Sequence, residues 1–388
     1  MQLSEVTSPA SQKEFYEMAV RLYKDEKNWI RPLDKDIEDL FHPESNKLFR
    51  HNAQAIRWLL KDKQGQTIGR IAAFINPKWK EKQPTGGIGF FECIDDQASA
   101  FRLFDAAKEW LADKGMEAMD GPVNFGERDK WWGLLVEGFY PPNYNMPYNF
   151  DYYQDFFESY GFNLYFKQFT YMRPVKGVDF DPKFHNRADI TLNHPDYNYR
   201  YLKGKELSEK APEYFMKVYN QAWARHLGKN MTLKEAQMMF GKMKPVIDPQ
   251  LIFFGFYNAE PVSFFISIPE LNQLFKYVDG KMNLMGKLKF LYHKTFNPPN
   301  KMLGLVFGVV PEHQGKGVES AMIKRYNEMS SRSSFPYETI EMNWIGDFNP
   351  KMMRVCEQIN ATIYKTHHTY RYLFDREKPF ERHPIFQK

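Results

Sequence analysis

Two glycines, Gly315 and Gly317, stand in the short segment Val310–Glu319, between an apolar run and a segment with helical periodicity. The run 303–310 is typical of a buried strand, and apolar residues recur at helical spacing from Val318 onward. Glycines at such a junction let the backbone turn tightly and gather N–H groups at a helix N-terminus, where the peptide dipoles favour an anion. The segment therefore predicts a phosphate-binding loop, with an ordinary strand–turn–helix connection as the alternative.

Coenzyme A is the phosphate ligand that fits this loop best. The loop lacks the length and the Lys-Ser/Thr ending of a nucleotide P-loop, and it lacks the spacing of a dinucleotide fingerprint. We expect the backbone N–H groups of Gly315, Gly317 and Val318 to meet the pyrophosphate.

The loop and its surroundings resemble the acyl-CoA-binding motif of the GNAT acyltransferase superfamily, which is a strand, then Val-x-Pro-x-x-Gln-Gly-x-Gly, then a helix. The order of the following elements is similar too, with a strand at 339–344, a helix from Asn349 to Ile359, and closing hairpin strands at 362–365 and 369–374. The resemblance implies an acyl-CoA co-substrate, acetyl-CoA in the simplest case, and an amine acceptor. The residues it implies at the cofactor are Val309, Val310, Gln314, Gly315, Lys316, Gly317, Val318 and Asn349.

Two residues depart from the family pattern. Glu319 stands where the family usually has Gly or Ala, and it would place a carboxylate beside the pyrophosphate. Cys356 stands where the family commonly has a Tyr that protonates the leaving thiolate. A cysteine thiol has a pKa of about 8.5, close to that of the leaving thiol, so Cys356 is a candidate acid. Its alternative role is a small buried apolar residue on a helix face.

The expected strand 339–344 alternates polar and apolar side chains, which places Glu341 and Asn343 on one face. In a GNAT-type transferase, an amine attacks the thioester directly, so the site must remove a proton from an ammonium. We expect Glu341 to be the base, directly or through water, and Asn343 to position the substrate. The alternative is a solvated strand face. Tyr364 and Tyr370 are further candidates for the acid.

Length and composition indicate a cytoplasmic protein of two domains. The chain has 388 residues, of which 17% are aromatic, and no apolar run is long enough to span a bilayer. The start has neither a basic leader nor an apolar signal core. The cysteines Cys93 and Cys356 are far apart in sequence, as expected for reduced thiols. A net charge of +5 is too mild to imply nucleic acid.

No metal site is expected from the spacing of histidines and cysteines. His367 and His368 are adjacent, but neighbouring residues on a strand point to opposite faces. We expect this pair to be a feature of a strand surface rather than a chelate.

The same order of elements occurs twice along the chain. Each half begins with a strand and an amphipathic helix, continues through a hairpin to another strand and helix, and ends with a helix and a strand. The resemblance therefore implies an α+β (mixed α/β) fold of two GNAT-like domains, each a mixed, mostly antiparallel sheet flanked by helices. We expect a degenerate domain at 1–175, a connector at 176–198 and an acyl-CoA-binding domain at 199–388.

The first half has no glycine loop at the equivalent position. It has Asp95-Asp96-Gln97 there, and two carboxylates repel a pyrophosphate. We expect this half to form a wall of the substrate cleft, and we expect the second half to bind CoA by itself.

Two aromatic-rich insertions are candidates for acceptor contacts. The first, Gly121–Asn149, is too long for a plain connector. It presents Asn124, Asp129 and Asn145 among aromatic rings, and we expect Asn124, Trp132 and Tyr148 to contact the acceptor, with a packed Ω-loop as the alternative. The second, Pro269–Asn300, interleaves five lysines with aromatic residues. It predicts a lid, a contact for an anionic surface, or a solvated helix.

Three functions are compatible with the sequence. The first is an N-acyltransferase that uses acyl-CoA and a small or peptidic amine. The second is a non-catalytic acyl-CoA-binding or scaffolding protein, which Glu319 and Cys356 favour. The third and weakest is a nucleic-acid or membrane-surface binder that uses the basic aromatic insertion. The sequence does not determine the acceptor, the acyl length or the oligomeric state.

Overall fold

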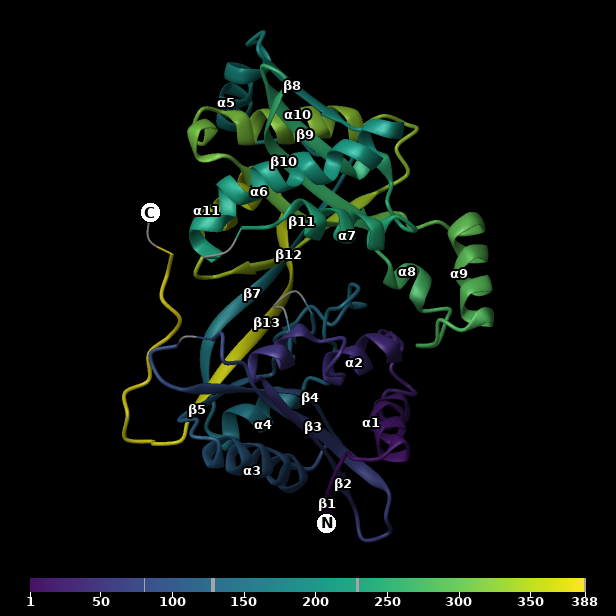
Figure 1. Cartoon of the computed structure of the whole chain (residues 1–388), viewed down its shortest axis with the longest axis vertical. Coiled ribbons are helices and arrows are strands. Elements are labelled where there is room, and N and C mark those ends of the chain that lie inside the picture. Colours follow the sequence, from purple (N-terminus) through teal and green to yellow (C-terminus); the bar gives the residue numbers. More distant parts are fainter. Residues whose placement is uncertain (80, 127–129, 228–229, 387–388) are drawn as a thin grey trace.

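The computed structural model describes residues 1–79, 81–126, 130–227 and 230–386 (Figure 1). The elements of the first half are β1 (Gln2–Glu5), α1 (Pro9–Leu22), α2 (Asp34–Phe41), β2 (Gln54–Lys61), β3 (Thr67–Ile75), β4 (Thr85–Cys93), α3 (Gln97–Asp113), β5 (Ala118–Gly121), β6 (Leu134–Glu137), α4 (Tyr153–Tyr160) and β7 (Asn163–Pro174).

The elements of the second half are α5 (Pro182–Leu192), β8 (Tyr197–Tyr201), α6 (Ala211–Leu227), α7 (Leu233–Met243), β9 (Ile252–Tyr257), β10 (Glu260–Pro269), α8 (Asn272–Phe275), α9 (Leu284–Phe296), β11 (Lys301–Val309), α10 (Val318–Ser330), β12 (Thr339–Gly346), α11 (Pro350–Gln358) and β13 (Thr362–Leu373). The series from β8 to β13 repeats the series from β1 to β7, apart from the insertion α8–α9 and the short strand β6.

The helices begin where the sequence offers capping groups. Ser8 caps α1, Asp96 caps α3 and Asn349 caps α11, each accepting a hydrogen bond from a backbone N–H of the first turn. Helix α10 instead begins at Gly317, whose φ of +94° is left-handed and suits glycine.

All strands in the described part of the chain belong to one sheet, in the order β1-β2-β3-β4-β5-β13-β7-β12-β11-β10-β9-β8, with β6 beside β13. The two halves exchange their last strands. β7, from the first half, lies beside β12 of the second, and β13 lies beside β5 of the first. β7 and β13 pair with each other and join the halves at the centre of the molecule (Figure 1).

The expected closing hairpin is wrong, because 362–373 forms a single strand. Residues Thr366, His367 and His368, which were expected to turn, pair with Phe169, Gln168 and Lys167 of β7. On the other side, the same three residues pair with β6. The chain therefore runs straight through a position where a turn was expected, because β7 continues past it on one side and β6 pairs with the same residues on the other.

Helices cover both faces of the sheet in each half. In the second half, α10 and α11 pack on one face through a core that includes Val318, Met322 and Cys356, and α6 and α7 pack on the other through Phe215 and Phe240. In the first half, α3 and α4 cover one face and α1 the other. The predicted α+β class, with a mixed sheet flanked by helices, is confirmed.

The segment expected to be a connector contains a helix of its own. Helix α5 lies within 176–198 and packs its Phe184 and Ala188 into the core beneath α10. The boundaries 1–175, 176–198 and 199–388 stay a prediction. Among the described helices, none is long and apolar enough to cross a membrane.

Candidate functional site

Two neighbouring strands of the second half separate at the centre of the sheet. β11 and β12 pair in parallel over Lys301–Gly304 and Thr339–Met342, and no pairing follows beyond these residues. On its other side, the register of β11 with β10 shifts, so that Leu305 has no partner residue. A bulge of this kind bends the strand and increases its twist. The bulge therefore begins where β11 leaves β12.

A cavity of about 320 Å³ occupies the space between the separating strands and helices α10 and α11. Most of its lining is apolar, from Val175, Phe180, Phe265, Met302, Leu305, Val306, Phe307, Ile323, Tyr326, Ile340, Met342, Trp344, Ile345, Met352, Val355 and Ile359. The polar side chains of the lining are Arg173, Asn327, Ser330, Asn343 and Asn349. A ligand that enters this cavity must therefore be largely apolar, with a few polar groups to orient it.

Arg173 belongs to the exchanged strand β7 and is 4% exposed. Its guanidinium donates to the backbone oxygens of Pro174, Ile359 and Val178, and to Asn327 Oδ1 at 3.3 Å. Burial lowers its pKa to about 10. These bonds give Arg173 a structural part in closing the cavity wall.

The glycine loop lies between the end of β11 and the start of α10, and its two glycines have different surroundings. Gly315 has a φ of +72°, and a Cβ added there would meet no atom within 4 Å. Gly317 is buried, and a Cβ there would lie 2.3 Å from the backbone oxygen of Arg187 in α5. Gly315 therefore faces open space, whereas Gly317 is required for packing against α5.

The other residues predicted to bind the cofactor lie around this loop. Gln314 and Lys316 are exposed, and Gln314 Nε2 donates to the backbone oxygen of Val309 at 2.9 Å. The N–H of Val310 donates to the backbone oxygen of Val262 at 2.9 Å, so it is already used within the sheet. Asn349 lines the cavity and also caps α11, accepting from the N–H of Met352. The two roles proposed for Asn349 are thus compatible.

Glu319 turns its carboxylate toward the loop. Its Oε1 accepts a hydrogen bond from the N–H of Gly315 at 3.4 Å. The N–H of Gly315, the loop residue with open space at its Cβ position, is thus held by an anionic group of the protein itself. An incoming phosphate must compete with this carboxylate for the N–H.

In the first half, the corresponding opening is filled. β4 and β5 pair in parallel over Thr85–Gly87, as β11 and β12 do. Beyond that point the N–H of Val123 donates to the backbone oxygen of Ile88 at 2.7 Å, and a Cβ on Gly89 would lie 1.8 Å from the oxygen of Val123. Val123 and Phe125 are fully buried there. The long loop thus occupies in the first half the space that is a cavity in the second.

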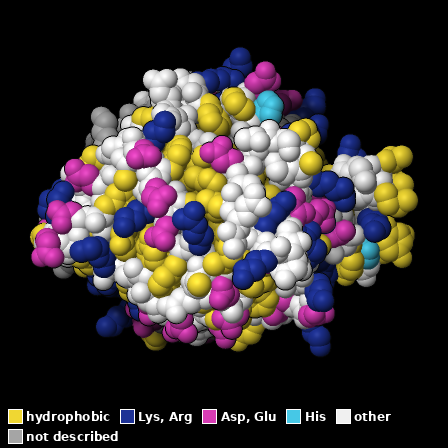
Figure 2. Space-filling model, turned by 90° about the horizontal axis from the view of Figure 1, so that it is seen from below, with side chains coloured by type: hydrophobic (Ala, Val, Ile, Leu, Met, Phe, Trp, Pro, Cys, Tyr) yellow, Lys and Arg dark blue, Asp and Glu magenta, His cyan; other side chains and the backbone are white. Residues whose placement is uncertain are grey.

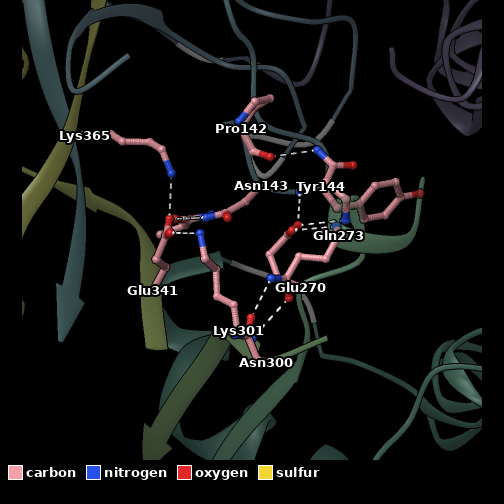
Figure 3. A network of polar contacts seen from close by, with 11 residues as sticks. Pro142, Asn143, Tyr144, Glu270, Gln273, Asn300, Lys301, Glu341 and Lys365 are labelled. Atoms are coloured by element: carbon pink, nitrogen blue, oxygen red, sulfur yellow. Dashed lines mark hydrogen bonds and ion pairs between the residues drawn. The ribbon is translucent and has the colours of Figure 1, made fainter. Parts of the chain in front are cut away.

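Glu341 lies at the centre of a buried polar network between the halves (Figure 3). Its Oε2 accepts from Lys365 Nζ and from Asn143 Nδ2, each at 2.7 Å, and its Oε1 pairs with Lys301 Nζ. Burial by itself raises the pKa of Glu341, but the ammonium groups of Lys365 and Lys301 outweigh this effect and hold the pKa below its usual value. Glu341 is therefore a buried carboxylate that stays ionised.

A second buried carboxylate, Glu270, holds the same loop of the first half (Figure 3). It accepts from the N–H groups of Tyr144, Asn272 and Gln273 at 2.8–3.1 Å. Asn272 Nδ2 in turn donates to the backbone oxygen of Pro142 at 2.9 Å. Burial raises the pKa of Glu270 despite these bonds. The loop Gly121–Asn149 reaches the second half, as the sequence predicted, and binds beside Glu341.

The acceptor residues predicted in that loop are not brought together. Asn124 donates to the backbone oxygen of Lys130 within the loop, and Tyr148 packs near Tyr23 in the first half. Trp132 belongs to a buried aromatic cluster against which Trp344, a lining residue of the cavity, also packs. Asp129 lies outside the described residues. Among Asn124, Trp132 and Tyr148, Trp132 is thus the residue connected to the cavity, through its cluster with Trp344.

The remaining predicted residues are also placed. Asn343 lines the cavity, and its Oδ1 lies 3.4 Å from Asn143 Nδ2. Cys356 is fully buried, is not among the lining residues, and has its pKa raised to about 12 by burial. As candidates for the acid, Tyr364 is half-buried and stacks on Tyr140, and Tyr370 donates to Glu158 in the first half. Their catalytic roles stay predictions.

The expectation that His367 is a surface feature is wrong. This residue is 1% exposed, because the first-half loop at Gly133 and the ring of Trp344 pack against its side chain. Burial lowers the pKa of His367 to about 3, so the imidazole is neutral. Its ring lies 6.1 Å from that of Trp344. Among the described residues, no group of three or more metal-ligating side chains is present.

Four residues of the network were missed in the sequence: Asn143, Glu270, Lys301 and Lys365. A charged residue directly after apolar ones is a weak signal, and Lys365 follows Ile363 and Tyr364 in β13. No spacing connects these four residues, however, since they come from two strands, β11 and β13, and from two loops.

The tandem GNAT fold is found in solved structures that match nearly the whole chain. The tandem GNAT protein from the clavulanic acid biosynthesis pathway is 11% identical, with a TM-score of 0.53, and the match covers 97% of this chain and 100% of that one. A GCN5-related glucosamine N-acetyltransferase region of a fungal multi-domain GH3 β-N-acetylglucosaminidase is 12% identical, with a TM-score of 0.55, and the match covers 96% of this chain and 38% of that one. The chain has a tandem GNAT-like fold.

Two curated proteins are similar in sequence over most of their length. The Bacterial ceramide synthase of Caulobacter vibrioides is 26% identical over 386 residues, which cover 94% of this chain and 95% of that protein. Protein YghO of Escherichia coli is 25% identical over 376 residues, which cover 92% of each. No protein-family model matches the sequence.

Proposed function

We propose that this chain is an N-acyltransferase that transfers an acyl group from acyl-CoA to an amine. The observation that carries the proposal is the apolar cavity between β11 and β12, which is also lined by α10, the helix that follows the glycine loop. The tandem GNAT-like fold supports the same reading. The first half has its equivalent opening filled by Val123, so we assign one acyl-CoA site to the chain, in the second half.

The residues of the second half fit acyl-CoA at both ends. Gly315 leaves open space in front of a helix N-terminus, where a pyrophosphate is favoured. The apolar cavity between β11, β12 and the later turns of α10 suits the pantetheine arm and the acyl chain. Asn349 lines the cavity, and Gln314 and Lys316 are exposed in the loop, where we propose that they contact the cofactor. When bound, acyl-CoA supplies an activated thioester carbonyl for attack by nitrogen.

The residues of the chain would position the amine and hold the segments around the cavity in place. Asn343 faces the cavity and is proposed to position the amine by hydrogen bonding. Transfer forms a carbon–nitrogen bond, breaks the carbon–sulfur bond, and moves one proton from nitrogen to the leaving thiolate. Glu341 stays the candidate base, but an efficient base needs a pKa near the working pH, and the two lysines lower that of Glu341. We therefore propose that Glu341 also positions Lys301, Lys365 and the first-half loop.

For the acceptor, we propose an amine that carries a long apolar chain. A relative that covers nearly the whole chain is named a ceramide synthase, and a ceramide is the amide of a long-chain amino alcohol and a fatty acid. The small or peptidic amine expected from the sequence is the alternative acceptor, and acetyl-CoA is the alternative to a fatty acyl-CoA.

A non-catalytic acyl-CoA-binding or scaffolding protein is the second candidate. The hydrogen bond from the Gly315 N–H to Glu319 favours it, because this carboxylate opposes phosphate binding. The burial of Cys356 away from the cavity lining also favours it, since the proposed acid could not reach the thiolate.

Turnover assays separate these functions. The full chain is incubated with acetyl-CoA or palmitoyl-CoA and either a sphingoid base or a panel of small amines and peptides, and free thiol is followed with a chromogenic reagent. We expect thiol release that depends on both substrates, with the amide product identified by mass spectrometry. Binding of acyl-CoA by calorimetry without turnover of any pair would favour the scaffolding function. Absence of binding would overturn both.

A further inference from the structure

Helix α9 (Leu284–Phe296) turns apolar side chains outward. Leu284, Met285, Leu288, Leu291, Tyr292 and Phe296 are each 53–77% exposed. The helix stands at the edge of the molecule (Figure 1), and hydrophobic side chains gather at the same edge in the space-filling view (Figure 2). A surface helix ordinarily shows its polar face to solvent, so this helix has the opposite arrangement.

The inner side of α9 is attached to the protein by a few contacts. Phe290 is buried and stacks on Phe275 of α8, with ring centroids 5.7 Å apart. His293 stacks on Tyr277 at 3.5 Å, and Gly286 is buried. At 3.6 residues per turn, these residues lie on one side, and the exposed apolar residues span an arc of about 140° on the other.

Lysines border the exposed apolar arc on both sides. By the same helical geometry, Lys287 and Lys294 lie along one edge and Lys289 along the other. Helix α9 contains no Asp or Glu. The surface is therefore apolar along its centre and positively charged along its margins. Long lysine side chains can extend from such margins while their stems cover apolar surface.

We propose that α9 docks on the surface of an anionic lipid bilayer. The apolar arc can enter the acyl region of such a membrane, while the lysines on both sides of it meet the anionic headgroups. The helix is 13 residues long, about 20 Å at 1.5 Å per residue, which is shorter than a bilayer core of about 30 Å. It therefore lies in the plane of the interface with its apolar side chains inserted.

The insertion that contains α9 is attached to the protein next to the candidate site. The insertion that holds α8 and α9 leaves the end of β10 next to Glu270 and returns at Lys301, the first residue of β11. Both residues belong to the polar groups around the loop of the first half, where Glu270 is buried and Lys301 is partly buried. Docking would hold this end of the cleft toward the bilayer. Membrane binding by itself does not depend on the proposed acyltransferase activity.

The test uses the full chain and sedimentation with large vesicles, without CoA or amine. Vesicles of phosphatidylcholine alone are compared with vesicles of phosphatidylcholine and phosphatidylglycerol. We expect binding to the anionic vesicles, with the apparent affinity reduced at least about tenfold in the double variant Leu288→Glu, Leu291→Glu. Met238→Glu, which replaces an exposed apolar residue of α7 (46% exposed), is the matched control and should bind like the wild type.

A triple variant, Lys287→Gln, Lys289→Gln and Lys294→Gln, separates the two parts of the interaction. We expect it to lose the preference for anionic vesicles and most of the salt dependence. Circular dichroism checks that each variant is folded. The proposal is overturned if the wild type binds neither type of vesicle, or if the double glutamate variant binds as the wild type does. A dimer in light scattering that the glutamate variant dissociates, without vesicle binding, would instead assign the surface to a second copy of the chain.

Discussion

Asn143 Nδ2 donates to Glu341 Oε2 at 2.7 Å, which ties a loop of the first half to a central strand of the second. Asn143 is completely buried, and the same amide nitrogen lies 3.4 Å from Asn343 Oδ1 at the cavity. The first half therefore reaches the candidate site through an amide side chain. Its role as a wall of the cleft is consistent with this contact.

Glu341→Gln tests whether the central carboxylate is a base or a positioning group. Removing a general base typically costs about 10²–10⁴-fold in rate. Breaking a buried ion pair typically costs about 3–5 kcal/mol of folding free energy. We expect kcat to fall with little change in CoA affinity, measured by steady-state kinetics and calorimetry at a temperature where urea unfolding shows the variant to be folded.

Lys365→Met provides the matched control, because it breaks the same ion pair and keeps the carboxylate. A positioning role predicts similar losses of kcat in both variants, whereas a base predicts a much larger loss for Glu341→Gln. Unchanged kcat in Glu341→Gln across the pH range would exclude Glu341 from the reaction.

Gly315→Val tests the phosphate site. The position faces open space, so the side chain itself meets no neighbour, but a branched residue at a φ of +72° is strained and would stand in front of the loop. We expect a loss of CoA affinity of at least about tenfold in calorimetry, from the loss of the close backbone approach. Gly65→Val is the control, because Gly65 also has a positive φ and open space and lies in the β2–β3 turn. Equal CoA affinity in Gly315→Val and wild type would show that the phosphate does not bind at this loop.

Glu319→Ala should tighten CoA binding. The variant removes a negative charge from the N–H of Gly315, and a charge pair at 4 Å in water is worth about 1 kcal/mol, or about fivefold in affinity. Glu328→Ala, near the other end of α10, keeps the same change in net charge and should leave the affinity unaltered. A weaker affinity in Glu319→Ala would indicate that the carboxylate orders the loop rather than opposing the ligand.

His367 should make folding stability depend on pH. Its pKa is about 3 in the fold and about 6.5 in an unfolded chain, so between these values the unfolded state binds more protons. The free energy of unfolding is therefore undiminished by His367 above pH 6.5. It decreases as the pH falls below that value, by up to about 1.4 kcal/mol per pH unit. Urea unfolding at several pH values between 5 and 7 should show a smaller slope for His367→Gln than for wild type, and the same slope as wild type for the exposed His51→Gln. Parallel slopes in all three proteins would contradict the burial of this imidazole in the neutral form.

The sequence predicted those features that depend on local pattern. Glycines after an apolar run located the loop at Gly315, and alternation placed Glu341 and Asn343 together on β12. The fold class and the repeated order of elements followed from the same patterns and are confirmed. The prediction was wrong near the end of the chain, where a turn was expected at Thr366–His368. A run of polar residues looks like a turn in isolation, and the two strands that hold it straight come from more than 190 residues away in the chain, as Gln168 opposite His367 illustrates.

The polar network could not be predicted for a related reason. Lys365, Lys301 and Asn143 meet Glu341 only because three distant segments converge on it. A buried lysine is costly without a partner, so its partner is implied by its burial, but burial itself depends on which strands flank it.

The exchange of β7 and β13 determines the order in which the molecule can be completed during synthesis. The sheet of the first half lacks the strand beside β5 until residues 362–373 have left the ribosome, because β13 is that strand. Conversely, a fragment that begins at residue 199 lacks β7, which pairs with β12 and supplies Arg173 to the cavity wall. The second half is thus not a unit that can be cut out by a single boundary. A nascent chain would have to keep the open edge of β5 protected through more than half of its translation, which makes that edge a target for chaperones.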